Sequence, residues 1–280
     1  MASGKGGTGK TTIAVNLALF LAKSYKVALF DLDVEEPNCN HFIHNDLIHH
    51  QDINVLRPII NESMCTHCGL CAELCEFNAL AVLPTQVMVF EELCHGCGLC
   101  SLACPEKAIK EKSHHLGIIE RSEETKNNLT FYEGRLRVGE ALSTPIIREL
   151  KKIAFREKSD FVILDLPPGS ACPVIEALSE THFAVLVTEP TPAGEHDLQI
   201  AINLVKQLKI PFGIVNNRSD VGDDRIDRLI RKEDYVLLLE IPHDKEILYL
   251  YSDGLPLIGT TTKFDAVFSN LWLRIEEVML

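Results

Sequence analysis

The residues from Gly4 to Thr11 form a glycine-rich run that ends in lysine and threonine. The run, Gly-Lys-Gly-Gly-Thr-Gly-Lys-Thr, fits the pattern G-x-x-x-x-G-K-[ST]. Glycines let backbone N–H groups turn toward phosphate oxygens at the N-terminus of a following helix, whose dipole favours anions. Lys10 is expected to reach the β- and γ-phosphates of a nucleotide, and the Thr11 hydroxyl to ligate Mg²⁺. The alternative is a loop that binds other anions or is merely flexible.

Eight of the 10 cysteines lie between Cys65 and Cys104, in two runs of identical spacing. Each run reads C-x₂-C-x₂-C-x₃-C; Pro105 follows the second run, whereas Glu76 follows the first. The spacing resembles that of bacterial ferredoxins with two [4Fe–4S] clusters, in which the fourth cysteine of each run ligates the other cluster. The resemblance implies one cluster on Cys65, Cys68, Cys71 and Cys104, and another on Cys94, Cys97, Cys100 and Cys75. Zinc is the alternative, but zinc sites usually present paired C-x₂-C knuckles.

The elements that must position these motifs are predicted from the hydrophobic pattern. Short apolar runs typical of buried strands occur at 26–33, 161–165, 183–188, 211–216 and 235–240. Helical stretches at 10–23, 145–158 and 194–208 alternate with them, and apolar residues at helical spacing return at 264–275. This alternation predicts an α/β fold with a mostly parallel sheet and helices on both faces.

Lys5 is a second lysine at the start of the loop, which reads Gly4-Lys-Gly-Gly-Thr-Gly-Lys-Thr-Thr12. This sequence resembles the deviant Walker A motif of the MinD/ParA/Mrp ATPases, a P-loop family that includes the nitrogenase iron protein. In that family this lysine reaches across a dimer, so the resemblance implies a homodimer bridged by nucleotide. Family members usually have a full strand before the loop. Only three residues precede Gly4, and we expect either a very short first strand or a sequence that starts late.

Other segments fit the same resemblance, which covers the chain outside about 61–140. Asp31-Leu-Asp33 resembles the first switch, in which Asp33 orients the attacking water. Asp165-Leu-Pro-Pro-Gly169 resembles Walker B and the second switch, in which the Gly169 N–H senses the γ-phosphate. The segment around Asn217 is similar to an adenine-reading strand end, and that around Pro242 to the loop beside the base.

The resemblance therefore implies a set of site residues. Catalytic roles fall to Lys5, Lys10, Asp33 and Asp165, and Mg²⁺ ligation to Thr11, Asp33 and Asp165. The nucleotide would be held by Gly4, Lys5, Gly6, Gly7, Thr8, Gly9, Lys10, Thr11, Thr12, Gly169, Asn217, Pro242 and Asp244.

The cysteine-rich block divides the chain. We expect residues 61–112 to form a small inserted α+β ferredoxin domain, between the parts of a P-loop ATPase domain at 1–60 and 141–280. Two β-like runs, 116–121 and 129–138, predict a connecting hairpin within 113–140 that returns the chain to the sheet.

Composition limits the partners and the location. Forty acidic against 27 basic side chains give a net charge of −13, which repels nucleic acid and anionic membrane. No signal peptide and no apolar stretch of about 20 residues is visible, so we expect a cytoplasmic location, where clustered cysteines are metal ligands rather than disulfides.

Several further residues are interpreted as ordinary. Cys39 and Cys172 are expected to be plain thiols; the alternative, by resemblance to the nitrogenase iron protein, is a cluster shared between subunits. The histidines after the first switch are expected to be solvated in a polar loop rather than to bind metal: His41, His44, His49 and His50. The C-terminal helix is expected to dock on the sheet, because its polar side carries few basic residues for a lipid surface.

Three functions remain open. The first, which the eight matched ligands favour, couples the ATPase cycle of a homodimer to electron transfer through two [4Fe–4S] clusters toward a redox partner. The second is an iron–sulfur cluster or metal carrier of Mrp type that supplies an apo-metalloprotein. The third is an electron-transfer or scaffold protein whose nucleotide site only regulates. The expected cofactors are two [4Fe–4S] clusters, ATP and Mg²⁺, with slow, partner-stimulated hydrolysis of ATP to ADP and phosphate.

Overall fold

The central strands are buried on both faces, because their side chains alternate between two apolar layers. In β1 (Val27–Asp31), Phe30 points into one layer and Leu29 into the other. β8 (Ala184–Thr188) divides its side chains between the same layers, and every residue of both strands is buried. A sheet of this kind requires helices on both faces.

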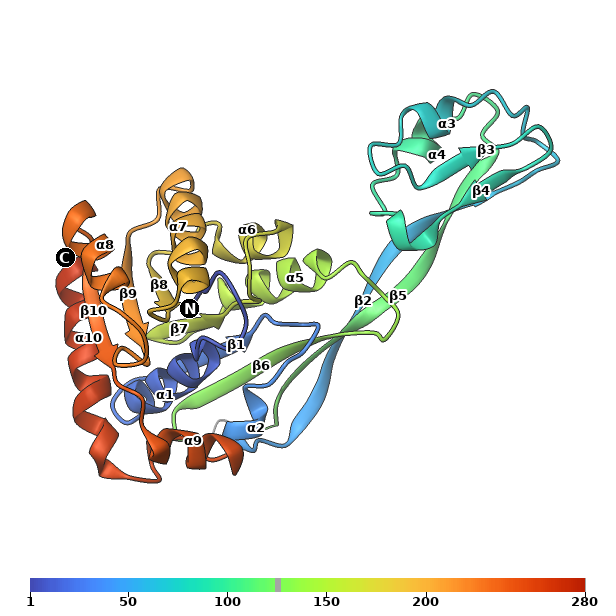
Figure 1. Ribbon diagram of the computed structural model, residues 1–280. Coiled ribbons are helices and arrows are strands. Elements are labelled where there is room, and N and C mark those ends of the chain that lie inside the picture. Colours follow the sequence, from blue (N-terminus) through green and yellow to red (C-terminus); the bar gives the residue numbers. More distant parts are fainter. Residues whose placement is uncertain (124–126, 280) are drawn as a thin grey trace.

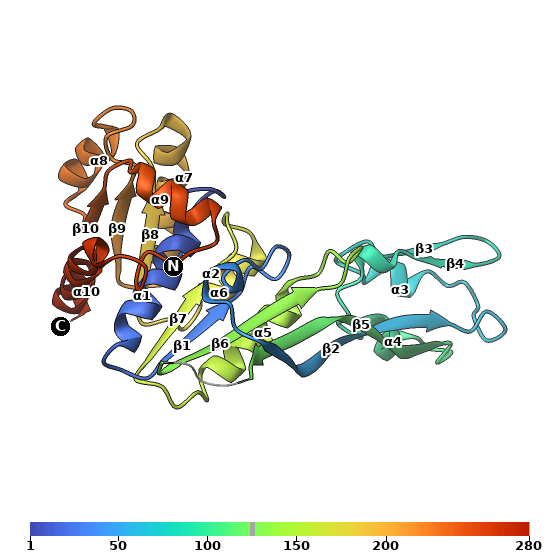
Figure 2. The same ribbon diagram turned by 90° about the horizontal axis from the view of Figure 1, so that it is seen from below.

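The computed structural model, which describes residues 1–123 and 127–279, has helices on both faces, as predicted (Figures 1 and 2). One face is covered by α1 (Lys10–Ala22) and α10 (Asp265–Met279). The other is covered by α5 (Thr144–Ala154), α6 (Cys172–Leu178), α7 (Pro192–Gln207) and α8 (Arg225–Glu233). Shorter elements are α2 (Asn40–Ile43), α9 (Lys245–Ser252) and the 3-10 turn η2 (Thr262–Phe264). No helix in these two described ranges is long and apolar enough to cross a bilayer.

The sheet is mostly parallel, as predicted, and it consists of two parts. Their strand orders are β2-β5-β6-β1-β7 and β10-β9-β8. The parallel pairs join β1 to β6 (Leu129–Leu136) and β7 (Phe161–Asp165), and β9 (Phe212–Asn217) to β8 and β10 (Leu237–Ile241). The antiparallel pairs are β2 (Leu47–Ile60) with β5 (Ile109–Ser122), β5 with β6, and β3 (Leu80–Val82) with β4 (Val87–Val89).

Residues 1–3 lie between the two parts of the sheet and join them through the backbone. Ala2 N donates to Val185 O, and Ala2 O accepts from Val187 N, both at 2.9 Å. On the other side, Leu166 N donates to Met1 O at 3.1 Å. The short first strand is therefore a single bridge, and the glycine-rich loop follows it directly.

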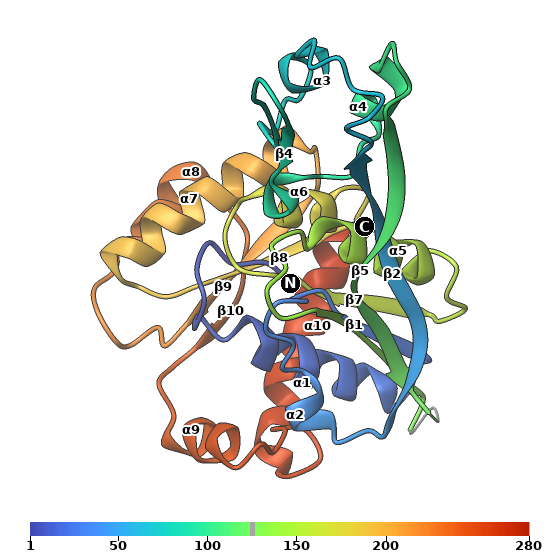
Figure 3. The same ribbon diagram turned by 90° about the vertical axis from the view of Figure 1, so that its right-hand side faces the viewer.

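β2 and β5 form a two-stranded ribbon that leaves the sheet and carries a cysteine-rich lobe, residues 61–108, at its far end (Figures 1 and 3). β5 pairs with β6 from Gly117 to Arg121, and toward the lobe its ladder continues with β2 alone. The lobe contains β3, β4, α3 (Leu70–Glu73), α4 (Leu99–Ala103) and the 3-10 turn η1 (Glu91–Leu93).

β2 was not predicted from the sequence, and the predicted start of β5 was too late. β2 includes His49 and His50, which were expected in a polar loop. Most of its side chains are exposed and its register shifts twice, so no regular alternation of apolar and polar residues marks it as a strand. Within the hairpin turn expected at 122–128, residues 124–126 lie outside the described ranges. The expected docking of the C-terminal helix is confirmed, since Phe268 and Leu271 are buried against the sheet layer.

An ion-pair network lies where the lobe meets the ribbon, with Arg57 and Glu140 buried at its centre and the Glu91 and Arg137 side chains 59% and 48% exposed. Arg57 Nη1 donates to Glu91 Oε2 at 3.1 Å, and Arg57 Nη2 donates to Glu140 Oε2 at 2.7 Å. Arg137 donates to Glu140 Oε1 at 2.6 Å, and His114 Nε2 lies 2.7 Å from the same oxygen. Burial opposes the ionisation of Glu140, but hydrogen bonds with His114, Arg57 and Arg137 outweigh it and lower its pKa to about 2.

We expect Gly117→Ala to lower the free energy of unfolding by about 1–3 kcal/mol, because the structure has no room for a methyl group there. A Cβ on Gly117 would collide with Arg135 O across the strand pair and lie 2.7 Å from Ile146 Cδ1. Urea denaturation measures the change. Gly6→Ala is the matched control, since a Cβ on Gly6 meets no atom within 4 Å. Equal losses in the two variants would contradict the assignment.

We expect Glu140→Gln to destabilise the protein by about 1–3 kcal/mol at neutral pH. The pKa of Glu140 is lower in the folded chain than its ordinary value of 4.5, so its contribution is present above that value and lost as the pH falls toward about 2. The stability difference between wild type and variant therefore shrinks as the pH falls from about 5 to about 2. Glu149→Gln, which removes a surface ion pair with Lys152, is the control. A difference for Glu140→Gln that is independent of pH would refute this explanation.

Candidate functional site

The carboxyl ends of three strands meet at one edge of the sheet, beside the start of α1. Asp31 ends β1, Asp165 ends β7 and Asn217 ends β9. A pocket of about 370 Å³ opens at this edge, which is where open α/β sheets bind their ligands. Many residues of the predicted nucleotide site line it: Lys5, Gly6, Gly7, Thr8, Gly9, Lys10, Thr11, Thr12, Asp33, Asn217, Pro242 and Asp244. Gly4, Asp165 and Gly169 lie outside its wall.

The glycine-rich loop owes its shape to two left-handed residues. Gly7 and Gly9 have φ angles of 81° and 93°, which residues with a Cβ rarely adopt. A Cβ on Gly9 would also collide with the Asn217 side chain, whose Nδ2 donates to Thr8 O at 2.8 Å. Asn217, predicted to contact adenine, thus also braces the loop from the end of β9.

Lys10 and Thr11 both bind the fully buried carboxylate of Asp165. Lys10 Nζ donates to Asp165 Oδ1 at 2.8 Å, and Thr11 Oγ1 donates to Oδ2 at 2.7 Å. Burial disfavours the charge of Lys10, but the adjacent Asp165 prevails and raises the pKa of Lys10 above its ordinary value. The cation and hydroxyl that the sequence assigned to phosphate and Mg²⁺ are therefore paired with Asp165 here.

Two carboxylates lie close together in the chain at the end of β1, Asp31 within the strand and Asp33 two residues later, and their surroundings differ. Asp31 is fully buried and accepts backbone N–H bonds, including one from Cys39 at 2.9 Å. Burial and the neighbouring Asp165 raise the pKa of Asp31. Asp33 borders the pocket, and burial raises its pKa to about 6. A carboxyl group with a pKa near neutrality is suited to take a proton from water.

The two cysteines outside the lobe lie in unlike places. Cys39 is fully buried with its Sγ 3.6 Å from Asp165 Oδ2, and burial raises its pKa well above the ordinary value. Cys172 is exposed at the start of α6. Cys39 cannot join Cys172 in a cluster shared between subunits, because its sulfur does not reach the surface. Asp31, Cys39 and Asp165 do place donor atoms within 4.8 Å of one another, but Lys10 already supplies the cation at this position.

Sequence reasoning missed the partners of the loop's first lysine. Lys5 Nζ lies 4.0 Å from Glu189 Oε1, just after β8. Arg218, which follows β9, donates to the other Glu189 oxygen at 3.3 Å and to Gly7 O at 3.5 Å. Glu189 directly follows the apolar run at 183–188, so the rule that sites form at the carboxyl ends of parallel strands would have found it.

Two other predicted residues, Gly169 and Asp244, already have backbone or side-chain partners. Gly169 N donates to Ser3 O at 3.0 Å, so its N–H faces the residues that precede the loop. Asp244 caps the N-terminus of α9 by accepting from Glu246 N at 2.8 Å, and it accepts from Lys263 Nζ at 2.6 Å. Hydrogen bonding from Lys263 lowers the pKa of Asp244. Pro242 lies in the loop between β10 and α9.

The lobe contains two pockets, and each gathers one of the predicted sets of four cysteines. The first holds Cys65, Cys68, Cys71 and Cys104. The second holds Cys75, Cys94, Cys97 and Cys100. Ile60 and Ile109, at the tip of the ribbon, border the first, whereas Leu56 and Pro58, nearer the body, border the second. We call these the outer and inner pockets.

The two halves of the lobe repeat their hydrogen bonds at the offset of the cysteine runs. Ala79 N donates to Cys75 Sγ and Ala108 N donates to Cys104 Sγ, both at 3.3 Å. Such N–H donors stabilise thiolates and tune the potential of a cluster bound to them. Burial raises the pKa of Cys100 to about 11, a cost that a bound cation would offset. Four thiols in each of two largely apolar pockets fit the donor set of a [4Fe–4S] cluster.

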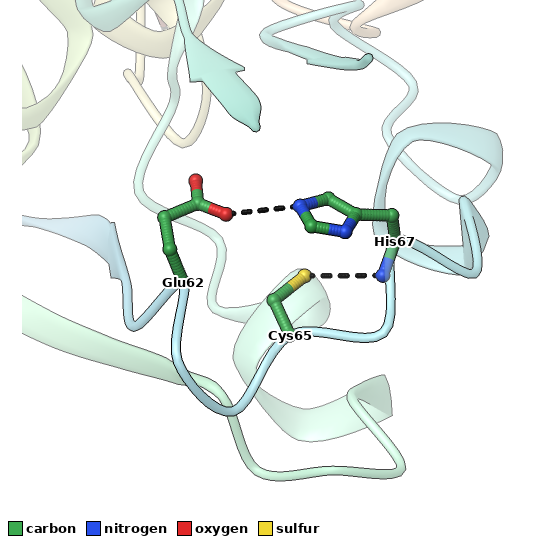
Figure 4. Close-up of side chains that lie close together, drawn as sticks. All are labelled: Glu62, Cys65 and His67. Carbon is green, nitrogen blue, oxygen red and sulfur yellow. Dashed lines mark hydrogen bonds and ion pairs between the residues drawn. The ribbon is translucent and has the colours of Figure 1, made fainter. Parts of the chain in front are cut away.

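One pair of residues breaks the symmetry of the lobe (Figure 4). His67 N donates to Cys65 Sγ at 3.4 Å, and the His67 ring lies 3.0 Å from Glu62 Oε2. Glu62 Oε1 also accepts from Val87 N at 2.9 Å, which ties the first cysteine loop to β4. The second run has Gly96 at the position of His67, and its own histidine, His95, stacks on Phe77 with ring centroids 3.7 Å apart.

Comparison with known proteins places this geometry in context. Residues 1–257 match the family described as the CobQ/CobB/MinD/ParA nucleotide binding domain, CbiA. An uncharacterized protein of Methanocaldococcus jannaschii is 31% identical over 252 residues, covering 90% of this chain and 87% of the relative. An iron-sulfur cluster carrier protein of Pyrococcus furiosus is 24% identical over 272 residues, covering 91% and 77%.

Solved structures share the fold. The septum site-determining protein MinD of Pyrococcus horikoshii, complexed with Mg-ADP, has a TM-score of 0.62 at 20% identity, covering 99% of this chain and 94% of that one. The cell division ATPase MinD of Pyrococcus furiosus has a TM-score of 0.60 at 21% identity, with coverage of 99% and 96%. Because the family match extends over nearly the whole chain, the protein belongs to the CobQ/CobB/MinD/ParA nucleotide-binding family.

Proposed function

We propose that this protein binds and hydrolyses ATP as a homodimer and uses the cycle to govern two [4Fe–4S] clusters in its lobe. The observation that carries the proposal is the coexistence, in one chain, of the loop pocket and of two pockets that each contain four cysteines. The domain division follows from it: an ATPase at 1–60 and 141–280, a ferredoxin at 61–112 and a connecting hairpin at 113–140.

The nucleotide site works by an exchange of partners. Lys10 and Thr11 are neutralised by Asp165 in the structure, so an incoming triphosphate would compete for Lys10. Thr11, Asp33 and Asp165 would hold Mg²⁺, which would neutralise charge on the phosphate oxygens. The backbone N–H groups of the loop would surround the β-phosphate, as at other helix N-termini.

Hydrolysis needs a base and a closed site. Asp33 borders the pocket with a pKa of about 6, so it would be ionised at neutral pH and would orient the attacking water. Lys5 is one-third exposed and held only loosely by Glu189, which leaves it free to reach the nucleotide of a second subunit. ATP would thereby favour the dimer through contacts that ADP does not make.

The lobe would hold its clusters permanently. The outer pocket would take one cluster on Cys65, Cys68, Cys71 and Cys104, and the inner pocket another on Cys75, Cys94, Cys97 and Cys100. Such clusters supply one-electron chemistry. Four cysteine ligands for each cluster leave no open coordination position on iron at which an acceptor protein could begin to take the cluster. This favours electron transfer to a redox partner over cluster transfer.

A cluster carrier is the second candidate, and the relatives favour it. Proteins named iron-sulfur cluster carrier proteins from Pyrococcus and Rickettsia are 24–25% identical to this chain. In such a function the bound iron would pass to an apo-metalloprotein during the ATP cycle. The two candidates differ in whether iron leaves the protein.

Lys10→Ala is expected to lower ATP hydrolysis by about 100-fold or more, because it removes the cation predicted to contact the β- and γ-phosphates. Phosphate release from the anaerobic holoprotein measures the rate. Lys23→Ala is the control, since Lys23 pairs with Asp265 at the surface away from the pocket. Hydrolysis by Lys10→Ala at the wild-type rate would remove the catalytic part of the proposal.

Anaerobically prepared protein is expected to contain about eight irons per chain, and Cys97→Ser about four, because one of two clusters is lost. Cys172→Ser is the control and keeps all of its iron, since Cys172 lies outside both pockets. Incubation with ATP and an apo-ferredoxin acceptor separates the candidates. Retained iron supports electron transfer, whereas iron recovered in the acceptor supports the carrier.

A further inference from the structure

Glu62 and Glu91 occupy equivalent positions, three residues before the first cysteine of each run, but they have different partners. Glu62 pairs with His67 inside its own loop. Gly96 replaces that histidine in the second run, and the ring beside Glu91 is that of His114 from the ribbon, whose Nδ1 lies 3.8 Å from Glu91 Oε2. Glu91 instead accepts from Arg57 of the ribbon at 3.1 Å. The Arg57–Glu91 contact, which has no equivalent at Glu62, therefore attaches the inner half of the lobe to the ribbon.

Arg57 extends this attachment to the chain that returns to the body. Its second guanidinium nitrogen donates to Glu140 at 2.7 Å, and Glu140 also accepts from Arg137. The side chains of Arg57 and Glu140 are only 8% and 6% exposed. A buried ion pair cannot separate without leaving a charge unpaired in a poorly solvated place, so Arg57 must follow Glu140 when that segment moves.

The segment that carries Glu140 is bonded to the nucleotide pocket's first switch. Leu136 N, at the end of β6, donates to Val34 O at 2.7 Å. Val34 is buried and directly follows Asp33, which borders the pocket. Arg137, the next residue after Leu136, holds Glu140. A continuous series of short contacts thus leads from Asp33 to Glu91 and the inner cysteines.

We propose that Arg57 and Glu91 are positioning residues that transmit the nucleotide state of the switch after Asp33 to the inner cysteine pocket. The inference rests on the proposed function and adds the series of contacts by which the nucleotide site would act on the inner pocket. ATP would move Val34 and the segment at 136–140, Arg57 would follow Glu140, and Glu91 would carry the loop of Cys94 with it. Two sites are coupled only when both bias the same structural element, and the Arg57 network is that element here.

The test is hydrogen exchange by mass spectrometry on the anaerobic holoprotein, with and without Mg²⁺ and a non-hydrolysable ATP analogue. In the wild type, the analogue is expected to change exchange several-fold in peptides covering 136–143 and 91–97. In Glu91→Gln the change persists at 136–143 and is lost at 91–97, because only the last contact is removed. Glu92→Gln makes the same charge change one residue away, at an exposed position, and behaves as the wild type.

In Glu91→Gln, exchange at 91–97 could also change because the loop of Cys94 loses local structure. A second measurement does not depend on exchange in that loop. Coupling is reciprocal, so the dissociation constant of the analogue differs several-fold between oxidised and dithionite-reduced wild type. The ratio approaches one in Glu91→Gln and is unchanged in Glu92→Gln. A wild type with no response at 91–97, or a Glu91→Gln variant that responds as the wild type does, would overturn the inference. Iron content and analogue binding of the same samples report separately on the proposed function.

Discussion

A carboxylate without exposed surface has to be neutralised where it lies, and Asp165 imposes this constraint on the whole site. It lies at the end of a central strand, beside a second buried carboxylate, Asp31, and a buried thiol, Cys39. Lys10 is the cation that makes this group stable, and Thr11 completes its hydrogen bonds. The start of α1, the loop before it and the ends of β1 and β7 are all fixed by this one pairing.

The same pairing explains how the site is stable before a ligand enters. Three groups that a nucleotide needs already have a protein partner: Lys10 has Asp165, Asn217 has the Thr8 carbonyl and Gly169 has the Ser3 carbonyl. At these groups binding exchanges one contact for another, so its free energy includes the difference between two sets of interactions. In the proposed coupling, contacts that change partner at the switches would also displace the chain that follows them, and the signal toward the lobe would begin there.

The sequence predicted the body well because its signals are local. Buried parallel strands appear as apolar runs, and the loop motif depends on glycine conformations that few other residues adopt. The grouping of the eight cysteines into two sets was implied by the resemblance of their spacing to that of ferredoxins with two clusters. Arg57 and Glu140 could not be predicted, because their importance arises from pairing across the fold rather than from their neighbours in the chain. β2 escaped for a related reason: it is exposed on most sides and carries no periodic pattern.

The length of the ribbon means that a small tilt at its base produces a larger displacement of the lobe. Beyond the point where β5 leaves β6, β2 continues through about seven residues, or roughly 23 Å at 3.3 Å per residue. A tilt of about 10° at the base of such an arm displaces its tip by about 4 Å. A small rearrangement at the nucleotide site that tilted the base of the ribbon would thereby become, at the tip, a displacement comparable to the width of a side chain. For a partner protein bound at the tip, each cycle of nucleotide binding and hydrolysis would then change the distance between that partner and the ATPase body.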